Sequence, residues 1–147
     1  MSRVAVLFAL LFCAVLALAA PAPAPQGNAT TSTFPELDKR VTHTGRGTWY
    51  YPSQNQGNCG FWDSDSSPVV AISKARYDAN NGGNCNQWVA ITNKANGKTA
   101  YGRTRDSCQS CDQSSLDMSP GLFKKIASLG TGEITISWHF QAKGWSP

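Results

Sequence analysis

Residues 104–120, TRDSCQSCDQSSLDMSP, contain the side chains of this sequence that are best suited to chemistry. Cys108 and Cys111 have the C-x-x-C spacing that occurs in zinc sites, in redox motifs and in disulfides. Zinc would need a second such pair or histidine partners, yet His43 and His139 lie far away in the sequence. A thioredoxin-like redox pair would open a helix in a βαβ unit, whereas this pair lies in a polar loop. We therefore expect a disulfide-held loop, with no metal and no cofactor.

Aspartates in the same stretch offer a second kind of chemistry. Asp106 follows a predicted strand and Asp117 precedes a predicted helix, so both could face one groove. Two carboxylates across a groove are what an inverting glycosidase uses as acid and base. Asp117 could instead support the N-terminus of the helix through hydrogen bonds and the helix dipole. Asp112 is expected to be a solvated loop charge.

The first forty residues indicate the compartment. Residues 1–20 combine an early basic residue with an apolar stretch and end in Ala-Ala, which predicts a signal peptide; the stretch is short for a membrane anchor. Residues 21–40 are rich in Pro, Ala and Thr, carry a glycosylation sequon at Asn28 and end in Lys39-Arg40, which predicts a disordered pro-segment with a dibasic cleavage site. We expect a secreted protein, extracellular or in the cell wall, with one domain over 41–147.

The charge of residues 41–147 limits the classes of partner that the domain is expected to bind. Ten basic and seven acidic side chains give a mild positive charge, and no run of Lys or Arg is interleaved with aromatic residues. We therefore expect no nucleic-acid partner and no membrane partner, while weak attraction to anionic wall polymers is allowed. We also expect a monomer.

The cysteine count of the predicted domain is even, because Cys13 falls in the signal peptide. An even count in a small secreted chain indicates disulfides. Four cysteines allow three pairings, which their order alone does not distinguish: Cys59, Cys85, Cys108 and Cys111.

The rest of the domain has the pattern of a β protein. Runs rich in β-branched and aromatic residues are bounded by Gly, Asn, Ser and Pro, and they predict strands at 47–51, 68–73, 87–93, 98–105 and 132–140. The Asn96-Gly97 pair predicts a hairpin, because both residues accept positive φ. Five or six short strands with two small helices in about 100 residues favour a small barrel.

Two helices are predicted, a shorter turn and a longer helix marked by a capping signal. One follows Ser73, and the other runs from a cap at Ser119 to Gly130. The second places an apolar face toward the core, formed by Leu122, Phe123, Ile126 and Leu129. Trp88 and Trp138 are expected in the core, Trp145 in a tail and His139 on the surface of a strand.

The order of several motifs resembles a known family. These motifs are GTWYYP, NCGFWDSDSSPVVAIS, NCNQWVAITNKANGKTAYGRTRDSC, SSLDMSPGLFKKIA and GEITISW. They are similar to the secreted fungal rare lipoprotein A-like proteins, which are relatives of barwin, the first expansin domain, loosenins and family 45 endoglucanases. The resemblance implies a mainly β fold, a six-stranded double-psi β-barrel with one or two short helices. It also implies that Cys59 pairs with Cys85, which leaves Cys108 to pair with Cys111.

The same resemblance suggests a function. Asp117 matches the general acid of the endoglucanases or its expansin equivalent, but the position of the catalytic base on the first strand reads Trp49-Tyr50-Tyr51-Pro52, with no carboxylate. The usual Asp-Arg-Cys motif is also changed, to Asp106-Ser107-Cys108. These departures favour a non-enzymatic protein that binds and loosens cell-wall polysaccharide, such as cellulose, another β-glucan or chitin.

The expected polysaccharide-binding residues share one proposed groove: Thr48, Tyr50, Tyr51, Asp106 and Asp117. Trp62 offers a further apolar face. Two alternatives remain open. One is a glycoside hydrolase or lytic transglycosylase that works from a single carboxylate, and the other is a cysteine-protease inhibitor or effector that uses residues 107–115 as its inhibitory edge.

Overall fold

The structure is a computed structural model that describes residues 41–147. The predicted signal peptide, the pro-segment and the sequon at Asn28 lie outside the described residues and stay predictions. No helix within 41–147 is long and apolar enough to cross a membrane.

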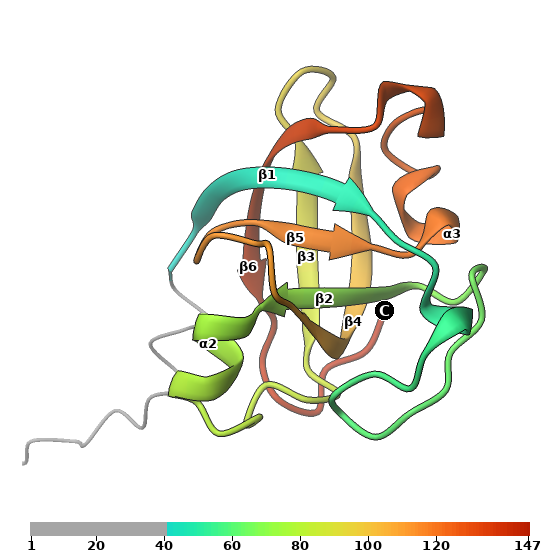
Figure 1. Cartoon of the computed structure of the whole chain (residues 1–147). Coiled ribbons are helices and arrows are strands. Elements are labelled where there is room, and N and C mark those ends of the chain that lie inside the picture. Colours follow the sequence, from blue (N-terminus) through green and yellow to red (C-terminus); the bar gives the residue numbers. More distant parts are fainter. Residues whose placement is uncertain (1–40) are drawn as a thin grey trace, which may run out of the picture. The chain divides into compact units, whose positions relative to one another are not determined.

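Six strands close into a mixed β-barrel, as Figure 1 shows. Around the barrel they follow the order β1-β5-β2-β4-β3-β6, with β1/β5 and β2/β4 parallel and the other neighbours antiparallel. Their bounds are β1 His43–Trp49, β2 Val69–Ser73, β3 Trp88–Asn93, β4 Thr99–Cys108, β5 Leu116–Met118 and β6 Ile134–Phe140. The expected mainly β, closed six-stranded fold with two short helices is confirmed.

Strand β5 has no counterpart among the runs predicted from the sequence. It is only three residues long, so no alternating pattern can mark it. Its neighbours create it: β5 pairs in parallel with β1 and antiparallel with β2, which closes the barrel. Leu116 and Met118 point into the core with no exposed surface, and Asp117 between them points outward.

Both helices begin after a serine cap, of which the sequence predicted the one at Ser119. The hydroxyl oxygen of Ser73 accepts from the amide of Arg76 at the start of α2, Lys74–Ala79. Helix α3 begins after the Ser119 cap but spans only Pro120–Phe123, so the helix predicted to reach Gly130 is too long. The chain then turns and re-caps at Ser128 before a 3₁₀ turn, Leu129–Thr131. A second 3₁₀ turn, Pro52–Gln54, follows β1.

The core lies inside the barrel and under α3. Its largest members have almost no exposed surface: Trp138, Phe123, Phe140, Ile72, Ile91, Leu122, Ile126 and Ile136. Leu129 packs against this cluster only in part. The prediction that Trp88 is a core residue is wrong, because its side chain is half-buried on the outer surface, where β3 begins.

Candidate functional site

The carboxylates predicted to act together lie in one row across four neighbouring strands. Ala71 of β2 pairs with Asp106 of β4 on one side and with Asp117 of β5 on the other, and Asp117 pairs with Thr48 of β1. Residues paired in register project to the same face of a sheet. Two strand spacings, about 10 Å, separate the backbones of the two aspartates, and the small Ala71 lies between them.

Asp117 is held by β1 rather than by the following helix. The hydroxyl of Thr48 donates to Oδ1 of Asp117 over 2.7 Å. Ser119 supplies the side-chain cap of α3, so the alternative role of Asp117 as a helix cap is not what the structure shows. Burial raises the pKa of Asp117, and the charge of Asp106 adds to this, while the hydrogen bonds from Thr48 and from the Met118 amide oppose it.

Tyr50 completes this polar site. Its amide donates to the carbonyl of Met118 over 2.9 Å, which places it beside the end of β5. Burial raises the pKa of the Tyr50 hydroxyl far above its ordinary value, and the nearby charges of Asp106, Asp117 and Asp63 raise it further. The phenol therefore stays neutral and can donate a hydrogen bond at any physiological pH.

Tyr51 does not join the carboxylates. Its ring contacts Trp49 edge-on at 5.3 Å, and it lines a separate cleft with Lys124 and Asp65 near α3. The structure thus brings together Thr48, Tyr50, Asp106 and Asp117, and places Tyr51 on a neighbouring surface. Whether these residues bind polysaccharide stays a prediction.

Asp106 also helps to hold the loop 55–63 in place through a hydrogen bond. Its Oδ1 accepts from the amides of Asn58 over 2.8 Å and Ser107 over 2.7 Å. The disulfide Cys59–Cys85 ties the same loop to the segment before β3. The pairing is the one that the resemblance implies, and so is the pairing of Cys108 with Cys111.

Further hydrogen bonds fix the loop 55–63 from several directions. The hydroxyl of Tyr77 in α2 donates to the carbonyl of Asn58 over 2.8 Å. Within the loop, the amide of Gly57 donates to the carbonyl of Phe61 over 3.0 Å. The amide of Cys59 donates to the carbonyl of Arg105 in β4 over 3.1 Å. The loop is therefore a braced element of the fold.

This braced loop displays two large aromatic side chains. Trp62 is 67% exposed and Phe61 is 40% exposed, with the guanidinium of Arg105 stacked over the Phe61 ring at 3.8 Å. Sequence reasoning named Trp62 as a possible contact and missed Phe61. The available signal was the placement of two adjacent aromatics directly after Cys59-Gly60 in an otherwise polar segment. We call Phe61 and Trp62 the aromatic edge.

The loop 107–115 is different in character. Its exposed residues are polar, and none of the exposed large hydrophobic side chains of residues 41–147 lies in it. Asp112 is an exposed loop charge, as expected, but its carboxylate also accepts from the amide of Ser114 over 2.9 Å. That bond, a further one from Ser115 and the charge of Arg46 lower the pKa of Asp112. Within residues 41–147, no group of three or more His, Cys, Asp or Glu side chains is placed to hold a metal ion.

The closed six-stranded mixed barrel with a disulfide-braced loop beside it is a double-psi-like β-barrel. No protein-family model matches the chain. The papain inhibitor of Streptomyces mobaraensis is 36% identical over 102 residues, which cover 66% of this chain and 70% of that protein. The solved structure of the Streptomyces papain inhibitor matches with a TM-score of 0.60 and 34% identity, over 68% of this chain and 94% of that chain. The chain belongs to the family of this inhibitor.

Expansin structures are also similar. A mutant of Clavibacter michiganensis expansin in complex with cellohexaose matches with a TM-score of 0.61 and 26% identity, over 73% of this chain. The apo form of that expansin gives the same values. The match covers 54% of the expansin, so this chain spans about half of it. These relatives are bacterial, and they do not show the fungal origin that the sequence motifs suggested.

Proposed function

We propose that this protein inhibits papain-like cysteine proteases. Its similarity to the papain inhibitor extends over 94% of the inhibitor structure at 34% identity, and this observation carries the proposal. The main expectation from the sequence was polysaccharide binding, and the comparisons favour the inhibitor alternative over it. The two disulfides fit an extracellular location, because such bonds persist in oxidising compartments.

The geometry supports the aromatic edge as the contact surface of the inhibitor. A protein that blocks a protease needs a rigid, exposed segment, since a loop ordered in advance loses little conformational entropy on binding. The loop 55–63 is tied by the Cys59–Cys85 disulfide and by the carboxylate of Asp106. Exposed aromatic side chains are the residues that most often dominate binding energies at protein interfaces. The loop 107–115 offers no such side chain, so we assign the contact to Phe61 and Trp62 instead.

Inhibition assays with papain test this proposal. The purified protein with both disulfides formed should inhibit papain in a dose-dependent way, and Trp62→Ala should weaken inhibition by at least tenfold, because a central interface aromatic contributes about 2 kcal/mol or more. The control is Tyr101→Ala, which removes another exposed aromatic, on the outer side of β4. It should change inhibition less than twofold. A protein that leaves papain fully active at micromolar concentration would contradict the proposal.

A second function is favoured by the polar row of Thr48, Tyr50, Asp106 and Asp117. The similar expansin was solved with cellohexaose, and this row gives a donor phenol and two carboxylates that could compete for the hydroxyls between glucan chains. Residues 49–52 hold no carboxylate, so hydrolysis by an acid and base pair has no base at that position. Cellulose and chitin pull-down, with soluble sugar release measured in parallel, should detect binding without turnover. Sugar release that Asp117→Asn abolishes would contradict the non-hydrolytic reading.

A further inference from the structure

The outer side of β4 carries a strip of stacked side chains that neither proposed function uses as a whole. From Tyr101 to Arg105 every second residue of this strand points outward, because Gly102 and Thr104 between them are buried in the barrel. Each outward residue from 101 to 105 packs against an aromatic ring: Tyr101 on Trp145 at 5.0 Å, Arg103 on Trp88 at 5.8 Å and Arg105 on Phe61 at 3.8 Å. The strip is therefore a continuous surface of rings and guanidinium groups.

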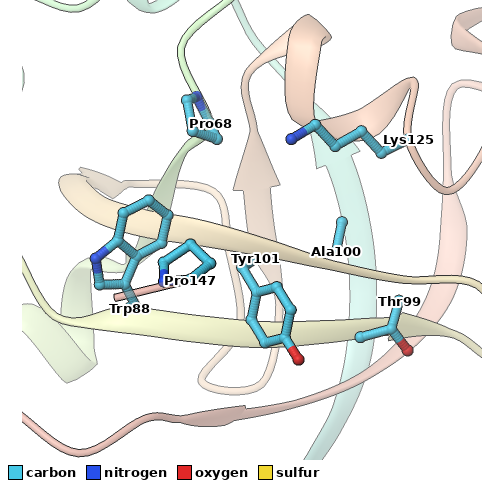
Figure 2. A pocket seen from close by; sticks show the side chains of 7 residues that line it. All are labelled: Pro68, Trp88, Thr99, Ala100, Tyr101, Lys125 and Pro147. Carbon is cyan, nitrogen blue, oxygen red and sulfur yellow. The ribbon is translucent and has the colours of Figure 1, made fainter. Parts of the chain in front are cut away.

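Three shallow clefts meet on this strip. Trp88 lines a cleft of about 220 Å³ with Tyr101 and Lys125, and Figure 2 shows Pro147 near the rings of Trp88 and Tyr101. Trp88 and Arg103 share a second cleft of about 170 Å³. Arg103 also lines a third, of about 270 Å³, with Lys143. The pair of Trp88 and Arg103, which are direct neighbours across β3 and β4, is thus the centre of the strip.

The charge at this centre is positive. Arg105 and Asp63 form an ion pair at 3.7 Å, so the acidic group in the second cleft has a partner. Among residues 41–147, Arg103 has no ion pair, and its Nε makes only a long bond of 3.4 Å to the carbonyl of Asn86. The amines of Lys125 and Lys143 belong to residues that line the adjoining clefts. A half-exposed indole beside a guanidinium without a carboxylate partner calls for a ligand with an apolar face and a negative charge.

We propose that this β3–β4 face binds an acidic oligosaccharide that contains uronate residues. The C–H face of a sugar ring packs on the indole of Trp88, and the carboxylate of the same or the next ring accepts a bidentate pair of hydrogen bonds from Arg103. A neutral glucan would leave the guanidinium without a partner, and a bare phosphate would leave the indole unused. Nucleic acid would require a track of several phosphate contacts, which two lysines around one arginine do not provide. The three shallow clefts adjoin one another along the strip, which suits successive sugar rings.

Calorimetric titration with trigalacturonic acid, with cellotriose as a neutral ligand of the same length, tests the proposal. Trigalacturonic acid should bind and change tryptophan fluorescence, with affinity that falls as salt increases, whereas cellotriose should show no binding at this face. Arg103→Gln should weaken uronate binding at least tenfold, while Arg46→Gln, an exposed arginine of β1 that pairs with Glu133, should leave it unchanged. Trp88→Phe keeps a ring and should retain most of the binding, and Trp88→Leu should lose it.

The outcomes separate this inference from the proposed inhibition. Thermal unfolding of each variant shows whether it folds, and Arg103→Gln on the surface of β4 should unfold at nearly the wild-type temperature. The papain inhibition of Arg103→Gln should equal that of the wild type. Equal binding of both trisaccharides, or uronate binding that survives Arg103→Gln, would overturn the proposal. Loss of papain inhibition in Arg103→Gln would assign the strip to the protease contact and overturn it as well.

Discussion

Asp117 is a half-buried carboxyl group that hydrogen bonds accommodate in the fold. Its neighbours in β5 fill the core, so the side chain must point outward beside Tyr50, where burial raises the pKa of the carboxyl. The hydroxyl of Thr48 compensates by donating to the ionised form. A half-buried carboxylate with a neutral phenol beside it is suited to exchange hydrogen bonds with a hydroxyl-rich ligand.

The raised pKa of Asp117 predicts a pH effect on stability. A folded-state pKa above the unfolded value means that the folded protein binds the proton more tightly, so this contribution is fully present below the unfolded pKa and is lost as pH rises through the folded pKa. Asp117→Asn removes the effect. The melting temperature of the wild type should therefore fall relative to that of Asp117→Asn as pH rises from 3 toward neutrality.

Asp112→Asn is the matched control, because the pKa of the Asp112 carboxyl in the wild type is shifted in the opposite direction from that of Asp117. Hydrogen bonds from Ser114 and Ser115 lower the pKa of Asp112, so its contribution is present above the unfolded pKa and is lost as pH falls through the folded pKa. The wild type should lose its advantage over Asp112→Asn on acidification. If the melting temperatures of Asp117→Asn and the wild type changed equally with pH, burial of Asp117 would have no energetic consequence.

At the scale of elements, β4 links the core to both candidate surfaces. Its inward residues pack under α3, its outward residues form the stacked strip, and its end carries Asp106. Gly102 faces Leu122 of α3 and Val70 of β2 inside the barrel. A Cβ atom at this position would lie 2.5 Å from Cδ2 of Leu122 and 2.7 Å from Cγ1 of Val70.

Gly102→Ala should therefore destabilise the barrel. Both contacts are with fully buried side chains, and overpacking of a core costs about 1–3 kcal/mol. Chemical denaturation should show a lower midpoint with an unchanged slope. Gly130→Ala is the control, because its added Cβ would meet its nearest neighbour, Oγ of Ser128, only at 3.7 Å. A Gly102→Ala protein as stable as the control would refute this account of the β4–α3 contact.

The elements also show which parts of the structure could be predicted from the sequence. The β6 alternation from Ile134 to Phe140 and the cap at Ser119 are local signals, and the structure confirms them. Strand β5 could not be predicted from pattern, because its pairing with β1 and β2 depends on residues more than forty positions away. The exposure of Trp88 is likewise set by tertiary packing, since it begins β3 at the edge of the barrel wall.

The candidate site was predictable to a similar degree. The family resemblance grouped Thr48, Tyr50, Asp106 and Asp117 with Tyr51. The register across β4, β2, β5 and β1 shows why Thr48, Asp106 and Asp117 meet. The hydrogen bond that the Asp106 carboxylate accepts from the amide of Asn58 carries no sequence signal, because it joins a strand end to a loop about fifty residues earlier. Of the aromatic edge, Trp62 was named from the sequence and only the adjacent Phe61 was missed.

For the whole molecule, the two disulfides hold different surfaces in place. Cys59–Cys85 joins residues 26 apart in the sequence and braces the aromatic edge, whereas Cys108–Cys111 joins residues 3 apart and shapes the loop 107–115. In the chain-entropy model the first disulfide raises the free energy of the unfolded chain by about 3.5 kcal/mol, and the second raises it by about 2 kcal/mol. The first bridge should therefore matter more for stability, and by its position it should also matter for inhibition.

Serine substitutions in pairs separate these effects. Cys59→Ser with Cys85→Ser should lower the melting temperature by more than 10 °C, since 1 kcal/mol corresponds to roughly 4–8 °C in a domain of this size, and should weaken papain inhibition because the aromatic edge loses its covalent brace. Cys108→Ser with Cys111→Ser should lower the melting temperature less and leave inhibition nearly intact. Inhibition measured well below both melting temperatures keeps the two readouts independent. If loss of Cys108–Cys111 abolished inhibition in a folded protein while loss of Cys59–Cys85 did not, the inhibitory surface would be the loop 107–115 and our assignment of the aromatic edge would be wrong.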